Sequence, residues 1–249
     1  MRIHRFGLLF AAFAISTGFA ARADASSIIY SPTPYLEPAD SPFSSVSFSY
    51  FWLETFEDGL FNTPGVTASS GVVNPPNMYV DSVDSDDGVI DGSGSTHGYS
   101  FYPVATTLTF TFDADALGSL PTHAGLVWTD IGFNSPTPYY GPVSFEAFGP
   151  LGASLGAIGP FELGDGTDQG ETGEDRFFGA FNTDGISSIR ISTNTTDWEI
   201  DHLQYGAESP TLALETPVPV PEPSTLTLLG LGVVVTRYRA YRRGRPAGK

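Results

Sequence analysis

Hydrophobic and polar residues alternate along much of the middle of the chain, as in strands that bury one face. The clearest case is 105–112, where Leu108, Phe110 and Phe112 alternate with threonines. Six other segments rich in β-branched and aromatic residues also read as strands, namely 46–53, 126–129, 143–148, 175–181, 186–192 and 198–205. Clusters of Gly, Pro, Asn and Asp separate them, and helical periodicity is scarce. The pattern predicts an all-β fold, an antiparallel β-sandwich that is jelly-roll-like.

The order of segments predicts one folded domain between two terminal regions. We expect a signal peptide at 1–25, the β-sandwich domain at 26–205, a linker at 206–216 and a separate C-terminal signal at 217–249. Residues 31–44 contain four prolines and are predicted to form a poorly ordered lead-in or an edge of the sheet.

The N-terminus has the three parts of a secretory signal peptide. Arg2 and Arg5 supply the positive charge, and an apolar stretch runs over 6–20. Small residues in A-x-A order follow at 21–25, the arrangement that signal peptidase cleaves. The apolar stretch is short for a permanent membrane span, which needs about 20 residues. The sequence therefore predicts export after cleavage by signal peptidase.

The C-terminus consists of a proline-rich spacer, an apolar run and a basic tail. The spacer 217–223 has proline at alternate positions, which keeps the backbone extended. The apolar run 226–235 follows. The basic tail then carries arginines that are expected on the cytoplasmic side, namely Arg237, Arg239, Arg242 and Arg243.

In this order, Val220-Pro221-Glu222-Pro223 and the segments after it resemble the PEP-CTERM sorting signal. The resemblance covers only residues 217–249. It implies that an exosortase, a membrane-embedded cysteine protease, recognises Pro221, Glu222 and Pro223 and removes the C-terminal helix and tail. It also implies the surface or extracellular matrix of a Gram-negative-type bacterium. Ten apolar residues span about 15 Å as a helix, half of a bilayer core, so this transmembrane segment is expected to hold the protein at the membrane transiently.

Charge is distributed very unevenly along the chain. The whole chain has a formal net charge of −17, but 26–216 contains 26 of the 28 acidic residues and only two bases, Arg176 and Arg190. The mature domain is therefore close to −24, which argues against a nucleic-acid partner. The absence of Cys excludes disulfides and thiolate metal sites.

Five carboxylates and several glycines in 81–94 predict a loop that could wrap oxygen ligands around Ca²⁺. The candidate ligands are Asp81, Asp84, Asp86, Asp87 and Asp91. The spacing does not match an EF-hand, and a solvated acidic loop is the alternative. A second acidic loop at 164–175 has the same character.

Aromatic residues are the other candidate for ligand binding. Tyr139 and Tyr140, in a proline-bounded loop, are predicted to be exposed and able to stack on sugar rings, whereas the tryptophans in apolar strands are predicted to be core. No motif for a hydrolase appears, and catalytic residues cannot be assigned. Asp201 and His202 are adjacent in a predicted strand, so we expect them to point to opposite faces.

The closing strands, with Glu174-Asp175-Arg176-Phe177-Phe178-Gly179 and Asp201-His202-Leu203-Gln204-Tyr205-Gly206, resemble secreted jelly-roll domains, some of which bind carbohydrate. The sequence therefore predicts a structural or adhesive surface protein that binds extracellular polysaccharide with Ca²⁺ and is not an enzyme. Two alternatives stay open: a secreted polysaccharide hydrolase that uses unidentified carboxylates, and a structural component with no small ligand.

Overall fold

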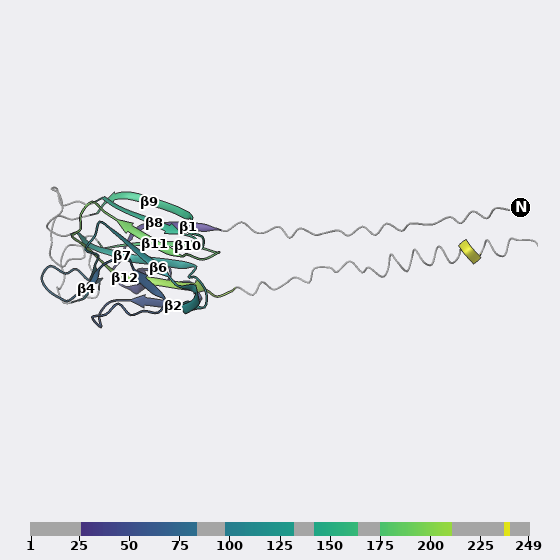
Figure 1. The fold of residues 1–249 in the computed structure, drawn as a ribbon, viewed down its shortest axis with the longest axis horizontal. Coiled ribbons are helices and arrows are strands. Elements are labelled where there is room, and N and C mark those ends of the chain that lie inside the picture. Colours follow the sequence, from purple (N-terminus) through teal and green to yellow (C-terminus); the bar gives the residue numbers. More distant parts are fainter. Residues whose placement is uncertain (1–25, 84–97, 132–141, 164–174, 211–236, 240–249) are drawn as a thin grey trace, which may run out of the picture. The chain divides into compact units, whose positions relative to one another are not determined.

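The computed structural model of the chain describes residues 26–83, 98–131, 142–163, 175–210 and 237–239 (Figure 1). The chain divides into two compact units, Met1–Ser209 and Pro210–Lys249. All the strands of the described residues lie in the first unit. The described residues of the second unit are Pro210 and Arg237 to Arg239; all are exposed, and the last three are helical.

The first unit is built almost entirely from antiparallel strands. The first five are β1 (Ser27–Pro34), β2 (Phe48–Glu54), β3 (Val66–Ala68), β4 (Val72–Asn74) and β5 (Ser100–Tyr102). The rest are β6 (Thr107–Phe112), β7 (His123–Ile131), β8 (Pro142–Phe148), β9 (Ser154–Glu162), β10 (Arg176–Asn182), β11 (Ser188–Ser192) and β12 (Trp198–Glu208). The described helices of this unit are a 3-10 turn, η1 (Pro38–Asp40), and a single turn, α1 (Ala114–Leu117).

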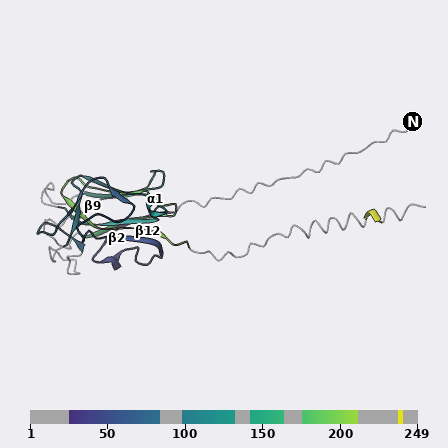
Figure 2. The ribbon, with the colours of Figure 1, turned by 60° about the horizontal axis from the view of Figure 1, so that its bottom comes forward.

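The strands form two antiparallel sheets. The larger sheet has the order β1-β10-β7-β12-β5-β4, and β2 pairs with the C-terminal half of β12. The smaller sheet has the order β3-β6-β11-β8-β9. Neighbours in a sheet are often distant in sequence, as where β12 lies between β7 and both β2 and β5. Figure 2 shows β2 beside β12 at the lower side of the domain.

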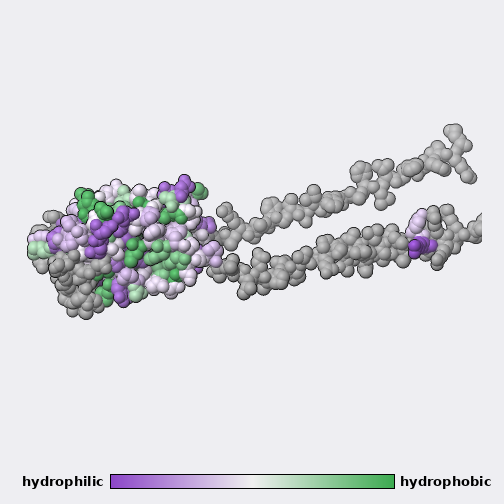
Figure 3. Space-filling view, turned by 90° about the horizontal axis from the view of Figure 1, so that it is seen from below, coloured by the Kyte–Doolittle hydropathy of each residue, from purple (hydrophilic) through white to green (hydrophobic). Residues whose placement is uncertain are grey.

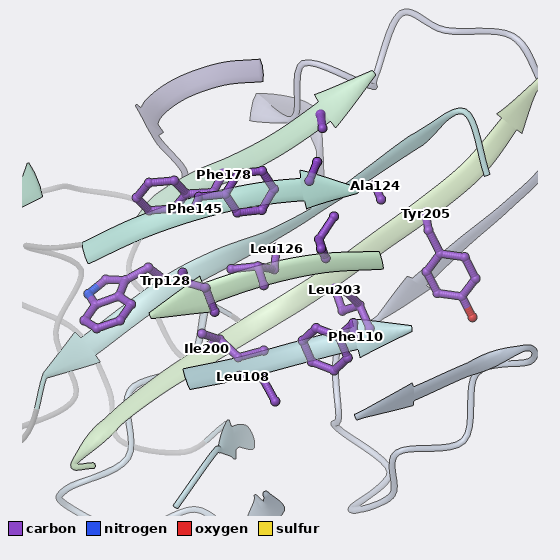
Figure 4. Packing of buried hydrophobic residues seen from close by; sticks show 14 of the residues in the cluster. Leu108, Phe110, Ala124, Leu126, Trp128, Phe145, Phe178, Ile200, Leu203 and Tyr205 are labelled. Atoms are coloured by element: carbon purple, nitrogen blue, oxygen red, sulfur yellow. The ribbon is translucent and has the colours of Figure 1, made fainter. Parts of the chain in front are cut away.

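The two sheets face each other across one hydrophobic core (Figure 4). On β6 the buried residues are Leu108, Phe110 and Phe112, as the alternation predicted. From the larger sheet, Leu126 and Trp128 of β7 and Ile200 and Leu203 of β12 pack in the same cluster. We call this unit the two-sheet domain.

A segment between β1 and β2 covers the outer face of the larger sheet. Tyr35 and Phe43 are fully buried there with Val127 of β7 and Phe177 of β10. The Phe43 and Phe177 rings meet edge to face, with centroids 5.2 Å apart. The prediction of a poorly ordered lead-in at 31–44 was therefore wrong for the covering segment, because its aromatic side chains bury against the sheet. The other prediction for 31–44, an edge of the sheet, holds for its first residues. They belong to β1, which pairs only with β10 among the described strands and so lies at the edge of the larger sheet.

Seven of the twelve strands correspond to segments that the sequence predicted, with boundaries that differ by up to three residues. Five strands were not predicted from the sequence, namely β1, β3, β4, β5 and β9. Three of these have only three residues each, too few for a periodic pattern to emerge. The other two contain Pro32, Pro34 and Pro160, which lowered their resemblance to strands.

Candidate functional site

Five acidic side chains are buried where β7, β10 and β12 approach one end of the larger sheet. They are at most 5% exposed and comprise Asp81, Asp130, Asp175, Glu199 and Asp201. Glu199 and Asp130 lie directly opposite each other in the β12–β7 pair. Buried carboxylates are costly unless hydrogen bonds or opposite charges compensate them, so this carboxylate cluster is the strongest candidate for a site in the described part of the chain.

Glu199 fastens the segment that follows β4 to the sheet. Its Oε1 accepts a hydrogen bond of 2.6 Å from Asn74 Nδ2, and its Oε2 accepts one of 2.9 Å from the backbone N–H of Asp81. Burial, with the nearby charge of Asp130, raises the pKa of Glu199 to about 8. Glu199 is therefore mostly protonated at neutral pH.

Asp201, two residues further along β12, fastens the same segment. Its Oδ2 accepts hydrogen bonds of 3.1 Å from the backbone N–H of Val83 and from Ser82 Oγ. Thr129 Oγ1 donates to the carbonyl of Asp81 at 3.2 Å. Residues 81–83 are thus pinned by side chains from two strands.

β12 contains a β-bulge at His202. His202 has φ of 43°, in the left-handed region, and the pairing with β7 shifts register between Asp201 and Gln204. The buried core positions of β12 change from Trp198 and Ile200 to Leu203 and Tyr205 across this point. The expectation that Asp201 and His202 point to opposite faces was therefore wrong, because the extra residue breaks the alternation.

The bulge places His202 in a polar network beneath the covering segment. Tyr35 Oη lies 3.0 Å from His202 Nδ1 and accepts a 2.8 Å hydrogen bond from Gln204 Nε2. Ser41 Oγ donates to Gln204 Oε1 at 2.7 Å. All four side chains are buried, so the network fixes the covering segment to β12.

Two further carboxylates, Glu54 and Glu57, accept hydrogen bonds from the backbone of loops. Glu54, at the end of β2, accepts backbone hydrogen bonds of 3.1 Å from Phe56, Asn62 and Thr63. Glu57 Oε1 accepts from the backbone N–H of Tyr99 at 2.5 Å. Like Glu199 and Asp201, these two acids accept hydrogen bonds from the backbone N–H groups of loops, which would otherwise lack a partner.

The chemistry open to the carboxylate cluster follows from this bonding. A general acid or base must come within about 3 Å of a substrate atom. Glu199 is 5% exposed and both of its oxygens accept hydrogen bonds within the protein. Glu199 is therefore placed to hold loops on the sheet, and it is not placed to act on a substrate.

Most of the predicted ligand residues lie outside the described residues. Of the candidate Ca²⁺ ligands only Asp81 is described, and it is buried beside Glu199. Asp84, Asp86, Asp87 and Asp91 lie outside, as do Tyr139 and Tyr140. Within the described ranges, no group of three or more acidic or histidine side chains is placed to hold a metal ion.

The grouping of Asp130, Glu199 and Asp201 was not predicted from the sequence. One signal for two of them was present, because Glu199 and Asp201 alternate with the apolar Trp198 and Ile200 in a strand that ends the domain. Acids at alternate positions indicate one polar face, but sequence alone does not show that another segment buries that face.

The three tryptophans divide into two groups. Trp128 and Trp198 are buried and stack on each other, with centroids 5.1 Å apart and an interplanar angle of 12°. Trp52, on β2, is 39% exposed. The prediction of core tryptophans in apolar strands therefore holds for the first two.

Residues 219–243 match the family model of the PEP-CTERM protein-sorting motif. The chain carries a PEP-CTERM sorting motif. This match contains Pro221, Glu222, Pro223 and the arginines up to Arg243, and it implies processing by an exosortase.

The PEP-CTERM motif also implies export to the cell surface or the extracellular space. Its match covers 25 residues and leaves the two-sheet domain without an assignment. No curated protein matches the chain at a significant level. Among the described residues, no helix has the length and apolar character needed to cross a membrane, and the apolar run 226–235 lies outside them.

Proposed function

We propose that the protein is a structural or adhesive component of the cell surface or extracellular matrix of a Gram-negative-type bacterium, in which a jelly-roll-like β-sandwich binds polysaccharide. The PEP-CTERM motif carries the proposal, because it directs the chain to an exosortase at the envelope. The two-sheet domain supports it, because its buried acids accept hydrogen bonds from backbone N–H groups of loops and so hold these loops on the sheets. A rigid scaffold with variable loops is typical of binding modules.

Exosortase processing gives the direct test of this proposal. We expect the double variant Pro221→Ala/Pro223→Ala to abolish processing, because proline fixes the extended backbone that the protease is proposed to recognise. In immunoblots of fractionated cells the full-length precursor should accumulate in the membrane fraction, and the surface form should be lost. Pro217→Ala, in the same spacer but outside residues 219–243, is the matched control and should leave processing intact. Normal surface display of the double variant would contradict the proposal.

Calcium binding is a further part of the proposal, and charge supports it. Residues 26–216 hold 26 acids and two bases, so the carboxylates of this part of the chain repel one another. A divalent cation that binds the folded state alone would relieve this repulsion and stabilise the fold by mass action.

Millimolar Ca²⁺ is accordingly expected to raise the melting temperature of the full chain, and EDTA to reverse the rise. Calorimetry with an equal concentration of Mg²⁺ controls for general screening. Equal shifts with both ions, or none with either, would remove calcium from the proposal.

A further inference from the structure

The turn between β11 and β12 presents an asparagine and a threonine to water. Asn194 and Thr196 are both exposed, and within the described residues neither side chain takes part in a hydrogen bond. Thr195 between them is buried, and its Oγ1 accepts a hydrogen bond of 3.2 Å from the backbone N–H of Asp197. The sequence Asn194-Thr195-Thr196 has the form Asn-x-Thr, which is the acceptor pattern for N-glycosylation.

Contacts on both sides hold this turn, which comprises residues 193–197, on the domain. The backbone N–H of Thr193 donates to the carbonyl of Thr106 at 3.0 Å. At the other end, Nε1 of Trp198 donates to the carbonyl of Ala105 at 2.6 Å. Neither bond uses an exposed side chain of the turn, so the acceptor pattern is displayed on a fixed backbone and stays accessible to an enzyme.

The other asparagines of the chain differ from Asn194 in sequence context and in bonding. They are Asn62, Asn74, Asn77, Asn134 and Asn182. None of them is followed two residues later by Ser or Thr. The four that the structure describes all use their side chains: three donate through Nδ2 over 2.6 to 3.1 Å, and Asn182 accepts from the backbone N–H of Asp184 at 2.9 Å. Asn194 is therefore distinguished twice, by its acceptor pattern and by an amide that is free of such bonds.

We propose that Asn194 is an N-glycosylation site that is modified when the chain is exported. Its Nδ2 attacks the anomeric carbon of an oligosaccharide carried on a lipid pyrophosphate. A bond forms between Nδ2 and this carbon, the lipid pyrophosphate leaves with the electron pair of the broken C–O bond, and Nδ2 gives up one proton to a base. An amide nitrogen is a weak nucleophile, so an oligosaccharyltransferase has to hold the acceptor, and the hydroxyl of Thr196 is the group that it recognises.

The position of the turn suits a bulky, hydrated modification. The turn precedes β12, whereas the chain leaves the domain after the opposite end of this strand, so a glycan on Asn194 keeps that exit free. On the side of the domain seen in Figure 3, polar areas separate the hydrophobic ones, as expected of a surface that faces water. The inference goes beyond the proposed function, because it requires the export that the PEP-CTERM motif implies but no binding of polysaccharide.

Mass spectrometry of the protein isolated from the cells that produce it tests the site. Cleavage after aspartate releases residues 185–197, a peptide with Asn194 as its sole asparagine. We expect this peptide to carry the added mass of a chain of sugar units, with fragment ions that place the mass on Asn194. Asn194→Gln should abolish the added mass, because its amide is displaced by one methylene group.

Two variants of Thr196 separate enzymatic recognition from an effect on folding. Thr196→Ala should lose the glycan, whereas Thr196→Ser keeps the hydroxyl and should retain it. Asn77→Gln is the matched control, because Asn77 is an exposed loop asparagine without a hydroxyl two residues further on. It should leave the mass of the peptide 185–197 unchanged, and the melting temperature of each variant shows whether it folds.

An unmodified peptide 185–197 in the exported protein would overturn the inference. A glycan that persists in Thr196→Ala would overturn it too, and so would sugar attached to Ser or Thr residues of this peptide alone. The proposed function fails separately, if the chain is not displayed at the surface. Surface display of an unmodified chain would therefore refute the glycosylation site and leave the proposed function standing.

Discussion

Deprotonation of Glu199 is expected to lower the stability of the two-sheet domain as the pH rises from about 4.5 to about 8. Burial raises the pKa of Glu199 to about 8 in the folded state, from its ordinary value of 4.5. Between these values the folded state holds a proton that the unfolded state has released, so raising the pH favours unfolding. The contribution is on the order of a few kcal/mol, fully present below about pH 4.5 and lost above about pH 8.

Glu199→Gln should remove this part of the pH dependence, because the amide is neutral throughout. Urea unfolding near pH 5 and near pH 9 would measure the difference in free energy between the two conditions for each protein. Glu162→Gln is the control, since Glu162 is an exposed glutamate on β9. A pH profile shared by both variants and the unaltered chain would contradict the assignment to Glu199.

Phe110→Ala is expected to cost about 3–5 kcal/mol of unfolding free energy, as is usual for a large aromatic residue removed from a packed core. Phe110 is fully buried at the centre of β6, and its ring contacts those of Phe61 and Phe101, with centroids 5.7 and 5.8 Å apart. Most of the cost comes from the lost burial and the remaining cavity. Urea denaturation of the full chain would measure it.

Thr111→Ala tests the alternation on the same strand. Thr111 follows Phe110 on β6 and is exposed, so its replacement should change the free energy of unfolding by about 0.5 kcal/mol or less. Comparable losses for the two variants would mean that β6 does not bury one face only.

Strands with a regular alternation could be predicted from the sequence because side-chain direction has a period of two residues. β6 and β8 show this directly, with Leu108, Phe110 and Phe112 buried on one and Val143, Phe145 and Ala147 on the other. The prediction failed where a strand departs from this period. β12 gains one residue at His202, and β9 contains Pro160. A bulge is set by contacts with neighbouring strands, which the local sequence does not record.

The carboxylate cluster could be predicted only in part, for a related reason. Asp81 was singled out because it belongs to an acidic stretch, whereas Asp130 and Glu199 are far apart in sequence and meet through the register of β7 with β12. Their burial depends on the segment that contains Asp81 and Val83. The sorting motif, in contrast, is a linear signal, and its recognition needs no tertiary structure.

β12 runs from the carboxylate cluster at one end of the larger sheet to the opposite end, where the chain leaves the domain. The strand has 11 residues and spans about 36 Å at about 3.3 Å per residue. Its N-terminal end carries Glu199 and Asp201, and the chain leaves its C-terminal end, after Glu208, toward the sorting motif. The start of β1 lies at that same end, because Ser27 pairs with Asn182 while Phe181 and Gly206 both pair with His123. The carboxylate cluster and the two ends of the domain therefore lie at opposite ends of the larger sheet, roughly 30 Å apart.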